Sequence, residues 1–518
     1  MNFDVLIIGT GIAGLSCALK LAEKGFLVGL VSREKDPKLS NTYYAQGGII
    51  YPQRDDEFLV SDIKKAGVGT NNPLAVDILR ERGGEILKEV LLDKVEVDFN
   101  RKATGELSFT REAAHSLPRI LYKGDFTGKE IQTSLLNYIK DIKRFPNIKL
   151  LQNHTAIDLL TPLHHGTSFN QRYVENKIVG AYLYNRENGA VVKAQAKVTV
   201  LATGGIGSLY LHNSNSEGAR GDGHAMAKRA GALLIDMEFI QFHPTTFYNR
   251  NSHRRFLISE ALRGEGGKLL NCKGESFMDK YHPDKELAPR DVVAKSIMEE
   301  TIETKHDCVY LDISHKDPDW IKERFPTIFE HCLQNKIDIT KESIPVIPAA
   351  HYTCGGVKTD LTGKTSLKNL YAVGEVACTG LHGANRLAST SLLEGLTWGY
   401  LAAEEMARDL NHISHYPDDQ IKDWEVSSGE CDNALVSQDW LTLKQTMWNY
   451  VGLTRTKRRL KRAESLFGEL YIELAKFYKH STLTDGLIGL RNAAEVASLV
   501  VQASLINKES IGCFQRKD

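Results

Sequence analysis

The chain lacks the cysteine, charge and hydrophobicity patterns of several protein classes. Its eight cysteines are scattered and form no CxxC pair, which argues against a disulfide framework, a zinc site or an iron–sulfur cluster. No apolar run approaches the ~18 residues that a membrane span requires. Positive and negative side chains balance at 65 each, and no basic stripe marks a nucleic-acid partner. We therefore expect free thiols, no metal, no nucleic acid, no membrane and a small polar substrate.

The start of the chain also has no segment typical of a secretory leader. The first apolar strand is expected from about residue 3, so neither a basic region nor an apolar leader core precedes it. We therefore expect a cytoplasmic protein. With 518 residues, the chain should divide into about two to four domains, because single cores stop growing beyond roughly 250 residues.

The most informative stretch is the first 24 residues. An apolar run over 4–8 leads directly into a GxGxxG motif formed by Gly9, Gly11 and Gly14, and an amphipathic stretch follows over 15–24. This order predicts a strand, a tight turn and a helix. Gly9 allows the turn, Gly11 admits a pyrophosphate, and Gly14 lets helix and strand pack closely. The helix N-terminus then attracts the phosphates of a dinucleotide.

The second expected strand does not identify the dinucleotide. An acidic residue for the adenosine ribose usually follows about 20 residues after the motif. Here the apolar run 27–31 ends at Ser32 and Arg33. The motif alone therefore does not choose between NAD and FAD.

Later segments carry clear periodicity. We expect helical structure over 56–90, strands over 148–161 and 178–201, a helix from Arg290 to about Thr304, a polar linker over 411–438 and a three-helix bundle over 440–507. The basic cluster at 457–459 is typical of a solvated helix face.

Four polar features leave a choice open on the residues alone. The segment NTYYAQGGIIY at 41–51 fits a plain turn or a loop along a flavin, and the cluster at 110–115 favours a solvated loop slightly over a site. Asp222 opens a helix either as a cap, the commoner use, or as a ligand of a cofactor hydroxyl. Arg290 stands beside the positive end of a helix, which is a poor place for a cation unless an anion meets it.

Ten motifs, taken in order, carry a resemblance to a known family. They are GTGIAG, AQGG, ATGG, GDGHAMA, QFHPT, ALRGEGG, APRD, HYTCGG, GE and HGANRLASTSLLEG, spread over about 3–405. Together they resemble the flavoprotein family of succinate dehydrogenase, fumarate reductase and L-aspartate oxidase. The resemblance implies an α/β fold: a Rossmann-type FAD-binding domain (1–229 and 353–410) interrupted by an α+β capping domain (230–352), then a linker (411–438) and a C-terminal helical bundle (439–518).

The resemblance also assigns the cofactor and its contacts. It implies one FAD per chain, and the family does not use an acidic residue after the second strand. By motif match the FAD contacts are Gly9, Thr10, Gly11, Ile12, Ala13, Gly14, Arg33, Asn41, Thr42, Tyr43, Tyr44, Ala45, Gln46, Gly47, Gly48, Thr155, Ala156, Asp222, Glu375, Ser391 and Leu392.

The substrate residues are carried over in the same way. A four-carbon dicarboxylate needs cations and donors at two separated carboxylates, and Arg386 is suited to grip one of them through two donors. By motif match the substrate contacts are Glu112, His243, Ser259, His351, Arg386 and Ser389, and Arg290 of APRD is the catalytic residue. The family has threonine more often at the position of Ser259, so the hydroxyl is kept.

One position and two segments favour the L-aspartate oxidase branch of the family. Members with covalent flavin carry a histidine where this chain has Asn41, so FAD should be bound noncovalently. The segment TREAAHS at 110–116 resembles the branch's TREGGHS, although Ala113 and Ala114 replace two glycines, and MWNYVGLTRT at 447–456 is similar to the branch's helical tail.

The branch implies a specific reaction. FAD would accept a hydride from L-aspartate to give iminoaspartate, and dioxygen, giving hydrogen peroxide, or fumarate would reoxidise the flavin. This is the first step of NAD biosynthesis through quinolinate, with a functional link to quinolinate synthase. The alternatives are a soluble fumarate reductase and an electron-transfer subunit docked on an iron–sulfur or membrane partner.

Overall fold

The main sheet of the computed structural model has a mixed strand order. The structure describes residues 1–52, 56–112, 114–249 and 254–518. Among these, one sheet of seven strands runs in the order β6 (Ile148–Leu151), β2 (Val28–Val31), β1 (Asn2–Ile8), β9 (Val191–Leu201), β8 (Gly180–Asn185) and β7 (His154–Leu159), with β16 (Leu370–Ala372) also beside β9.

The parallel strands of this sheet have the dinucleotide-binding order. β6, β2, β1, β9 and β16 pair in parallel, and counted along the chain they are the third, second, first, fourth and fifth parallel strands. That order places the ligand crevice at the carboxyl ends of β1 and β9, where the chain switches direction across the sheet. The expected strands over 148–161 and 178–201 are confirmed as β6 to β9, and β7, β8 and β9 form an antiparallel ribbon, since β7 pairs with β8 and β8 with β9.

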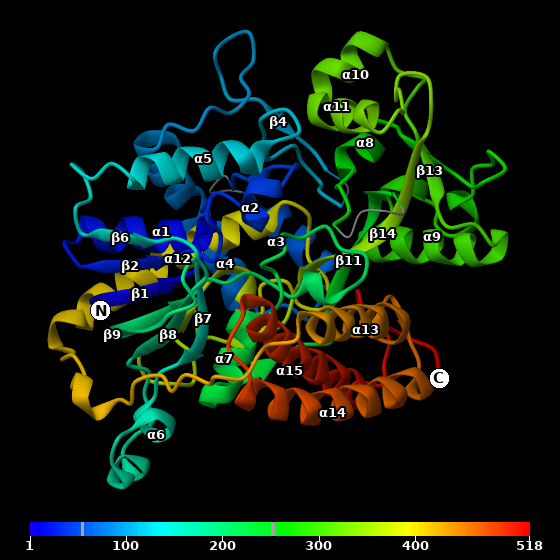
Figure 1. Cartoon of the computed structure of the whole chain (residues 1–518). Coiled ribbons are helices and arrows are strands. Elements are labelled where there is room, and N and C mark those ends of the chain that lie inside the picture. Colours follow the sequence, from blue (N-terminus) through cyan, green and yellow to red (C-terminus); the bar gives the residue numbers. More distant parts are fainter. Residues whose placement is uncertain (53–55, 113, 250–253) are drawn as a thin grey trace.

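One face of this sheet is covered by two helices far apart in the sequence. α1 (Ile12–Glu23) packs along α12 (Thr390–Asp409), as Figure 1 shows in blue and yellow. Gly395 and Gly399 of α12 make the approach close: a Cβ at 399 would lie 2.4 Å from the carbonyl oxygen of Ala13. The start of α1 is thereby fixed from a segment nearly 400 residues later.

The cap is the segment from Ile240 to Thr353, inserted between β9 and β16. Its sheet runs β11 (Ile240–Phe247), β14 (Ile344–Thr353), β13 (Val309–Asp312) and β12 (Lys268–Leu270), and its helices are α8 (Glu260–Gly264), α9 (Arg290–Thr304), α10 (Pro318–Arg324) and α11 (Pro326–Gln334). The expected helix at 290 is confirmed, with Pro289 at its N-cap. The cap has its own buried core and lies to one side of the main sheet (Figure 1).

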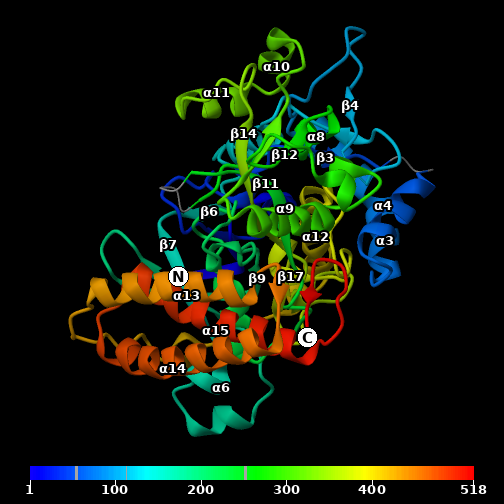
Figure 2. The same cartoon turned by 90° about the vertical axis from the view of Figure 1, so that its right-hand side faces the viewer.

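Residues 411–518, all of them described, form the helical segment. Its helices α13 (Asn433–Val451), α14 (Lys457–His480) and α15 (Asp485–Ile506) lie side by side (Figure 2), which confirms the expected three helices. The expected linker extends too far, because α13 already begins at Asn433. Asp432 accepts hydrogen bonds from the backbone N–H groups of Ala434 (2.8 Å) and Leu435 (3.4 Å) and starts the helix there.

The remaining α-helices and strands, with one π-helix, connect these parts. They are α2 (Asn41–Tyr44), β3 (Ile49–Ile50), α3 (Glu57–Ala66), α4 (Pro73–Leu87), a π-helix (Lys88–Lys94), β4 (Phe109–Thr110), β5 (Ile120–Leu121), α5 (Thr127–Ile139), α6 (Pro162–His165), α7 (Asp222–Ala230), β10 (Leu234–Ile235), β15 (Gly356–Lys358), β17 (Ala377–Cys378), β18 (Thr454–Arg455) and β19 (Gln515–Arg516). In the described part of the chain, no helix is both long and apolar enough to cross a membrane.

Candidate active site

One elongated cavity lies between the carboxyl ends of the main sheet and the cap. Every residue that the sequence assigns to FAD or substrate lines it, with the exceptions of Gly14 and Tyr43. A Cβ at Gly14 would lie 2.0 Å from the carbonyl oxygen of Gly9, so Gly14 acts through close packing. Tyr43 packs its ring edge-on against Tyr44, with centroids 5.3 Å apart.

The glycine turn forms the middle of the cavity. Gly9 has φ +121°, and a Cβ there would lie 2.1 Å from the carbonyl oxygen of Ala202 at the end of β9. Gly11 is the N-cap of α1 and has no side chain of its own, and the next backbone N–H, that of Ile12, donates to Thr42 Oγ1 at 3.1 Å. A Cβ at Gly11 would meet only the Thr42 hydroxyl, at 3.4 Å. The glycine at the helix start therefore leaves room for a phosphate beside the backbone.

The loop from Asn41 to Gly48 runs along the cavity wall, which favours the flavin-loop interpretation of this segment. Asn41 Nδ2 donates to Glu375 Oε2 at 3.2 Å, and Asn41 Oδ1 accepts from the backbone N–H of Ser216 at 2.8 Å. Glu375 also accepts from the backbone N–H of Thr353 at 3.0 Å. Burial raises the pKa of Glu375 to about 7. Near neutral pH its carboxyl group can therefore be protonated or ionised, to suit a neighbouring hydroxyl or amide group.

Three expected FAD residues lie at the far end of the cavity, beside the end of β2. These are Arg33, Thr155 and Asp222. Asp222 is not the N-cap of α7, because that position is taken by Gly221 with φ +83°. Its carboxylate instead accepts from Arg220 Nε at 2.9 Å and from Asn492 Nδ2 at 2.7 Å. The end of β2 is where a dinucleotide places its adenosine.

The opposite end of the cavity contains two fixed guanidinium groups. Arg290 opens α9 in the cap, and Arg386 precedes α12. Gln241 Oε1 accepts from Arg386 Nε at 3.2 Å and from Arg290 Nη1 at 3.4 Å. Gln241 Nε2 donates to the Arg386 carbonyl oxygen at 2.8 Å. Burial and the nearby Arg290 lower the pKa of Arg386 to about 10, so Arg386 remains charged at neutral pH, and this end of the cavity favours an anionic ligand.

A carboxylate stands in the same part of the cavity. Glu112 is 4% exposed, and Ser389 Oγ donates to its Oε2 at 2.8 Å. Burial and the nearby Glu260 raise the pKa of Glu112. The alternative of a solvated loop at this segment is wrong, since Glu112 and His115 are both buried.

The two alanines that replace family glycines sit in this loop. Ala113 lies outside the described residues. Ala114 has φ +65°, a left-handed conformation that costs a non-glycine residue about 1–2 kcal/mol. The chain therefore keeps a glycine-type backbone at Ala114 without the glycine.

The two histidines of the substrate end are uncharged at neutral pH. His243 and His351 lie with ring centroids 5.1 Å apart. Burial, with Arg290 and His351 nearby, holds the pKa of His243 well below its usual range. Burial, with Arg386 and Arg290 nearby, does the same to the pKa of His351. They can therefore offer or accept hydrogen bonds without adding charge. Ser259 caps α8 by accepting from the Ala261 N–H at 3.2 Å, which leaves its hydroxyl hydrogen for a ligand.

Sequence reasoning missed Gln241, Glu260 and Arg263 as members of this site. Arg290 Nε donates to Glu260 Oε2, and Arg263 Nη2 lies 3.6 Å from the same oxygen. Burial raises the pKa of Glu260, but the Arg290 and Arg263 guanidiniums outweigh it and keep that pKa low. Gln241 and Glu260 stand next to assigned residues in QFHPT and SEALRG, which is the signal that was available.

Comparison with known proteins agrees with this geometry. The model of the FAD binding domain family matches residues 4–392. L-aspartate oxidase 1 of Ralstonia nicotianae is 43% identical, covering 100% of this chain and 96% of the relative, and L-aspartate oxidase of Yersinia pestis is 42% identical, covering 99% and 96%. The chain belongs to the L-aspartate oxidase family. A solved structure of E. coli quinol fumarate reductase FrdA superposes with a TM-score of 0.88 at 28% identity, covering 100% of this chain and 91% of that one.

FAD is the cofactor of this L-aspartate oxidase family member, and the residues present fit it. The open helix start at Gly11 suits the pyrophosphate. Gln46 lines the cavity, and its Oε1 is buried without a hydrogen-bond partner among the described residues. This oxygen can accept a hydrogen bond from a donor such as a flavin N–H. When bound, FAD accepts the hydride of a substrate oxidation.

Asn41 leads to the first prediction, that the flavin is released by acid. Its amide is engaged by Glu375 and the Ser216 backbone, and an amide has no ring nitrogen to bond the flavin covalently. We expect precipitation of the purified chain in trichloroacetic acid to release all yellow colour into the supernatant. Flavin fluorescence that stays on the washed pellet would contradict noncovalent binding.

Proposed function

We propose that this chain catalyses the FAD-dependent oxidation of L-aspartate to iminoaspartate, with dioxygen or fumarate reoxidising the flavin. The reaction is the first step of NAD biosynthesis through quinolinate, in the cytoplasm and with a functional link to quinolinate synthase. The observation that carries the proposal is the charge pattern of the cavity: two guanidiniums joined through Gln241, and a buried carboxylate, Glu112, lining the same cavity.

This pattern matches the charges of L-aspartate. Its two carboxylates require two cations, which Arg386 and Arg290 supply, and its ammonium requires an anion or acceptor, which Glu112 supplies. Succinate and fumarate have the carboxylates but no ammonium. Glu112 therefore distinguishes the amino acid from the plain dicarboxylates.

The two arginines differ in their contacts and therefore in the roles that they suit. Arg386 Nη1 donates to Ser391 Oγ at 2.6 Å and its guanidinium lies 4.5 Å from the centre of the Tyr352 ring, so it is held rigidly for carboxylate binding. Arg290 contacts the buried carboxylate of Glu260. A proton that leaves Arg290 can be replaced through Glu260, and this supports a second activity, the reduction of fumarate, at the same site.

Peroxide formation tests the proposal directly. We expect the purified chain with FAD to produce hydrogen peroxide from L-aspartate in air, measured with a peroxidase-coupled dye. D-aspartate and succinate serve as controls and should give little. Reduction of fumarate by reduced dye without any oxidation of L-aspartate would instead assign a fumarate reductase, and the absence of turnover with both substrates would assign an electron-transfer subunit.

A further inference from the structure

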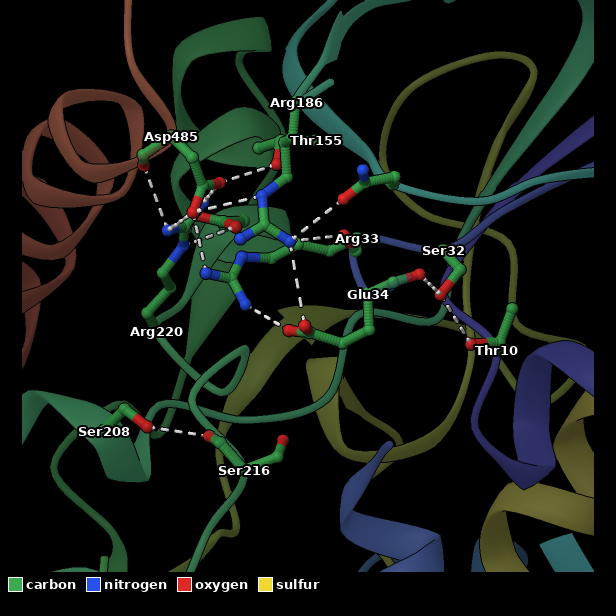
Figure 3. A network of polar contacts seen from close by, with 12 residues as sticks. Thr10, Ser32, Arg33, Glu34, Thr155, Arg186, Ser208, Ser216, Arg220 and Asp485 are labelled. Carbon is green, nitrogen blue, oxygen red and sulfur yellow. Dashed lines mark hydrogen bonds and ion pairs between the residues drawn. The ribbon is translucent and has the colours of Figure 1, made fainter. Parts of the chain in front are cut away.

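The first residue of α15 reaches from the helical segment to the adenosine end of the FAD cavity. Figure 3 shows its carboxylate among residues of the main sheet domain. Asp485 Oδ2 accepts from Arg33 Nη2 at 2.7 Å, and Asp485 Oδ1 accepts from Thr155 Oγ1 at 2.7 Å. Arg33 and Thr155 both line the cavity. One side chain of the helical segment thus holds two cavity-lining residues that lie more than 100 positions apart in sequence.

Arg220 extends the same contact to a third cavity-lining residue. Its Nη2 donates to Asp485 Oδ1 at 2.9 Å and its Nε donates to Asp222 Oδ2 at 2.9 Å. Asn492, two turns beyond Asp485 on the same face of α15, donates to Asp222 as well, at 2.7 Å. Asp222 lines the cavity, so α15 holds it both directly and through Arg220.

A glycine on this face of α15 makes room for the arginine. A Cβ at Gly489 would lie 2.4 Å from Arg220 Nη1 and 2.5 Å from its Cζ. The guanidinium therefore lies flat against the helix backbone, at the position where any other residue would place its side chain. Positions 485, 489 and 492 share one helix face, and Arg220 packs against that face.

The cations around Asp485 stabilise its ionised form. Burial alone raises the pKa of Asp485, but Arg220 and Arg33 outweigh it and hold that pKa well below its usual range. Arg186 adds a further cation, with its Nε 3.6 Å from Asp485 Oδ2. The Asp485 side chain is 17% exposed, so its ion pairs are only partly screened by solvent.

We propose that Asp485 is a positioning residue for FAD, which holds Arg33, Thr155 and, through Arg220, Asp222 in the arrangement that binds the adenosine half. The inference rests on FAD as the cofactor and does not depend on which substrate is oxidised. It has a reciprocal consequence, because binding free energies that are linked act in both directions. If the packing of α15 against these residues strengthens FAD binding, bound FAD must in turn stabilise that packing of α15.

The test is a titration of the deflavinated full-length chain with FAD, followed by the quenching of flavin fluorescence. We expect Asp485→Asn to raise the Kd for FAD by at least about fivefold, the lower end of coupling between linked sites. Gly489→Ala, which displaces Arg220, should weaken FAD in the same direction. The matched control is Glu495→Gln, which removes the α15 ion pair with Arg229 (2.7 Å) and touches none of Arg33, Thr155 and Asp222.

Hydrogen exchange on the unmodified chain gives a second readout that needs no variant. We expect FAD to slow exchange at the amides of 486–492, because it stabilises the docked helix. An FAD affinity within about twofold of the parent chain in both Asp485→Asn and Gly489→Ala would overturn the proposal, as would equal weakening in Glu495→Gln or unchanged exchange over 486–492. Neither measurement uses the substrate L-aspartate. Failure of the proposed oxidase activity would therefore leave this test valid.

Discussion

Replacing Arg290 with leucine is expected to abolish fumarate reduction, while FAD stays bound and part of the aspartate oxidation survives at saturating substrate. In fumarate reduction one alkene carbon must receive a proton, and Arg290 is the cavity cation that contacts a buried carboxylate able to resupply it, Glu260. Loss of a proton donor commonly lowers a rate by about two to four decades. Aspartate oxidation needs no proton at the adjacent carbon, so there Arg290 mainly positions a carboxylate.

The two activities and the flavin content must be measured on the same preparation. We expect Arg290→Leu to raise KM for aspartate more than it lowers kcat, because it removes one of several anion contacts. Arg290→Lys is the matched control: it keeps the charge but loses the planar fork that holds Glu260 and Gln241 together, and it should retain more aspartate affinity than leucine. Full fumarate reduction by the leucine variant would remove Arg290 from the mechanism, and loss of FAD would assign it to the fold.

Glu112→Gln should separate the activities in the opposite sense. An ammonium about 4 Å from a carboxylate gains roughly 4 kcal/mol at an effective dielectric of about 20, so we expect about a hundredfold loss in kcat/KM for L-aspartate after partial compensation by desolvation. Fumarate has no ammonium, and its reduction should change little. Glu106→Gln, an exposed position on the same segment, is the control. Equal losses in both activities would mean that Glu112 is structural.

The same residue predicts the pH profile of the parent chain. Its pKa is raised above the ordinary 4.5, and the protonated form does not attract an ammonium. As the pH falls through this raised value, kcat/KM for aspartate should fall, and it should be retained above it. The pKa values of His243 and His351 are held well below 6.5, and the Glu112 variant tells their contribution apart from that of Glu112. The acidic limb should be absent from the profile of Glu112→Gln.

Local patterns predicted the elements that carry the cofactor. A glycine turn between an apolar run and an amphipathic stretch predicts a strand, a tight turn and a helix, and the structure has this arrangement from Asn2 to Glu23. Proline and aspartate likewise mark the start of α9 at Arg290. The residues assigned by motif lie along one cavity because the family match supplied their distant partners. The residue types alone did not indicate which distant segments lie together.

The remainder depended on contacts between remote segments. Thr484 and Asp485 have the sequence of an ordinary helix start, and Thr484 does cap α15 by accepting from the Leu487 N–H at 3.2 Å. Nothing local indicates that Asp485 also reaches Thr155. Similarly, the cluster at 110–115 is polar enough for a surface loop, and only the packing of Ala388 and Ser389 against it shows that it is buried.

The packing of α1 against α12 has a consequence for how the protein is made. β1 pairs with β9, and Gly399 of α12 lies against Ala13 at the start of α1, so the first strand and helix leave the ribosome long before the segments that complete their surroundings. Because synthesis runs from the N-terminus, the nascent glycine turn stays unpacked until α12 has been added, and Ser391 and Leu392 of that helix are themselves part of the cavity wall. Flavin uptake is therefore a late event, which follows translation of most of the chain.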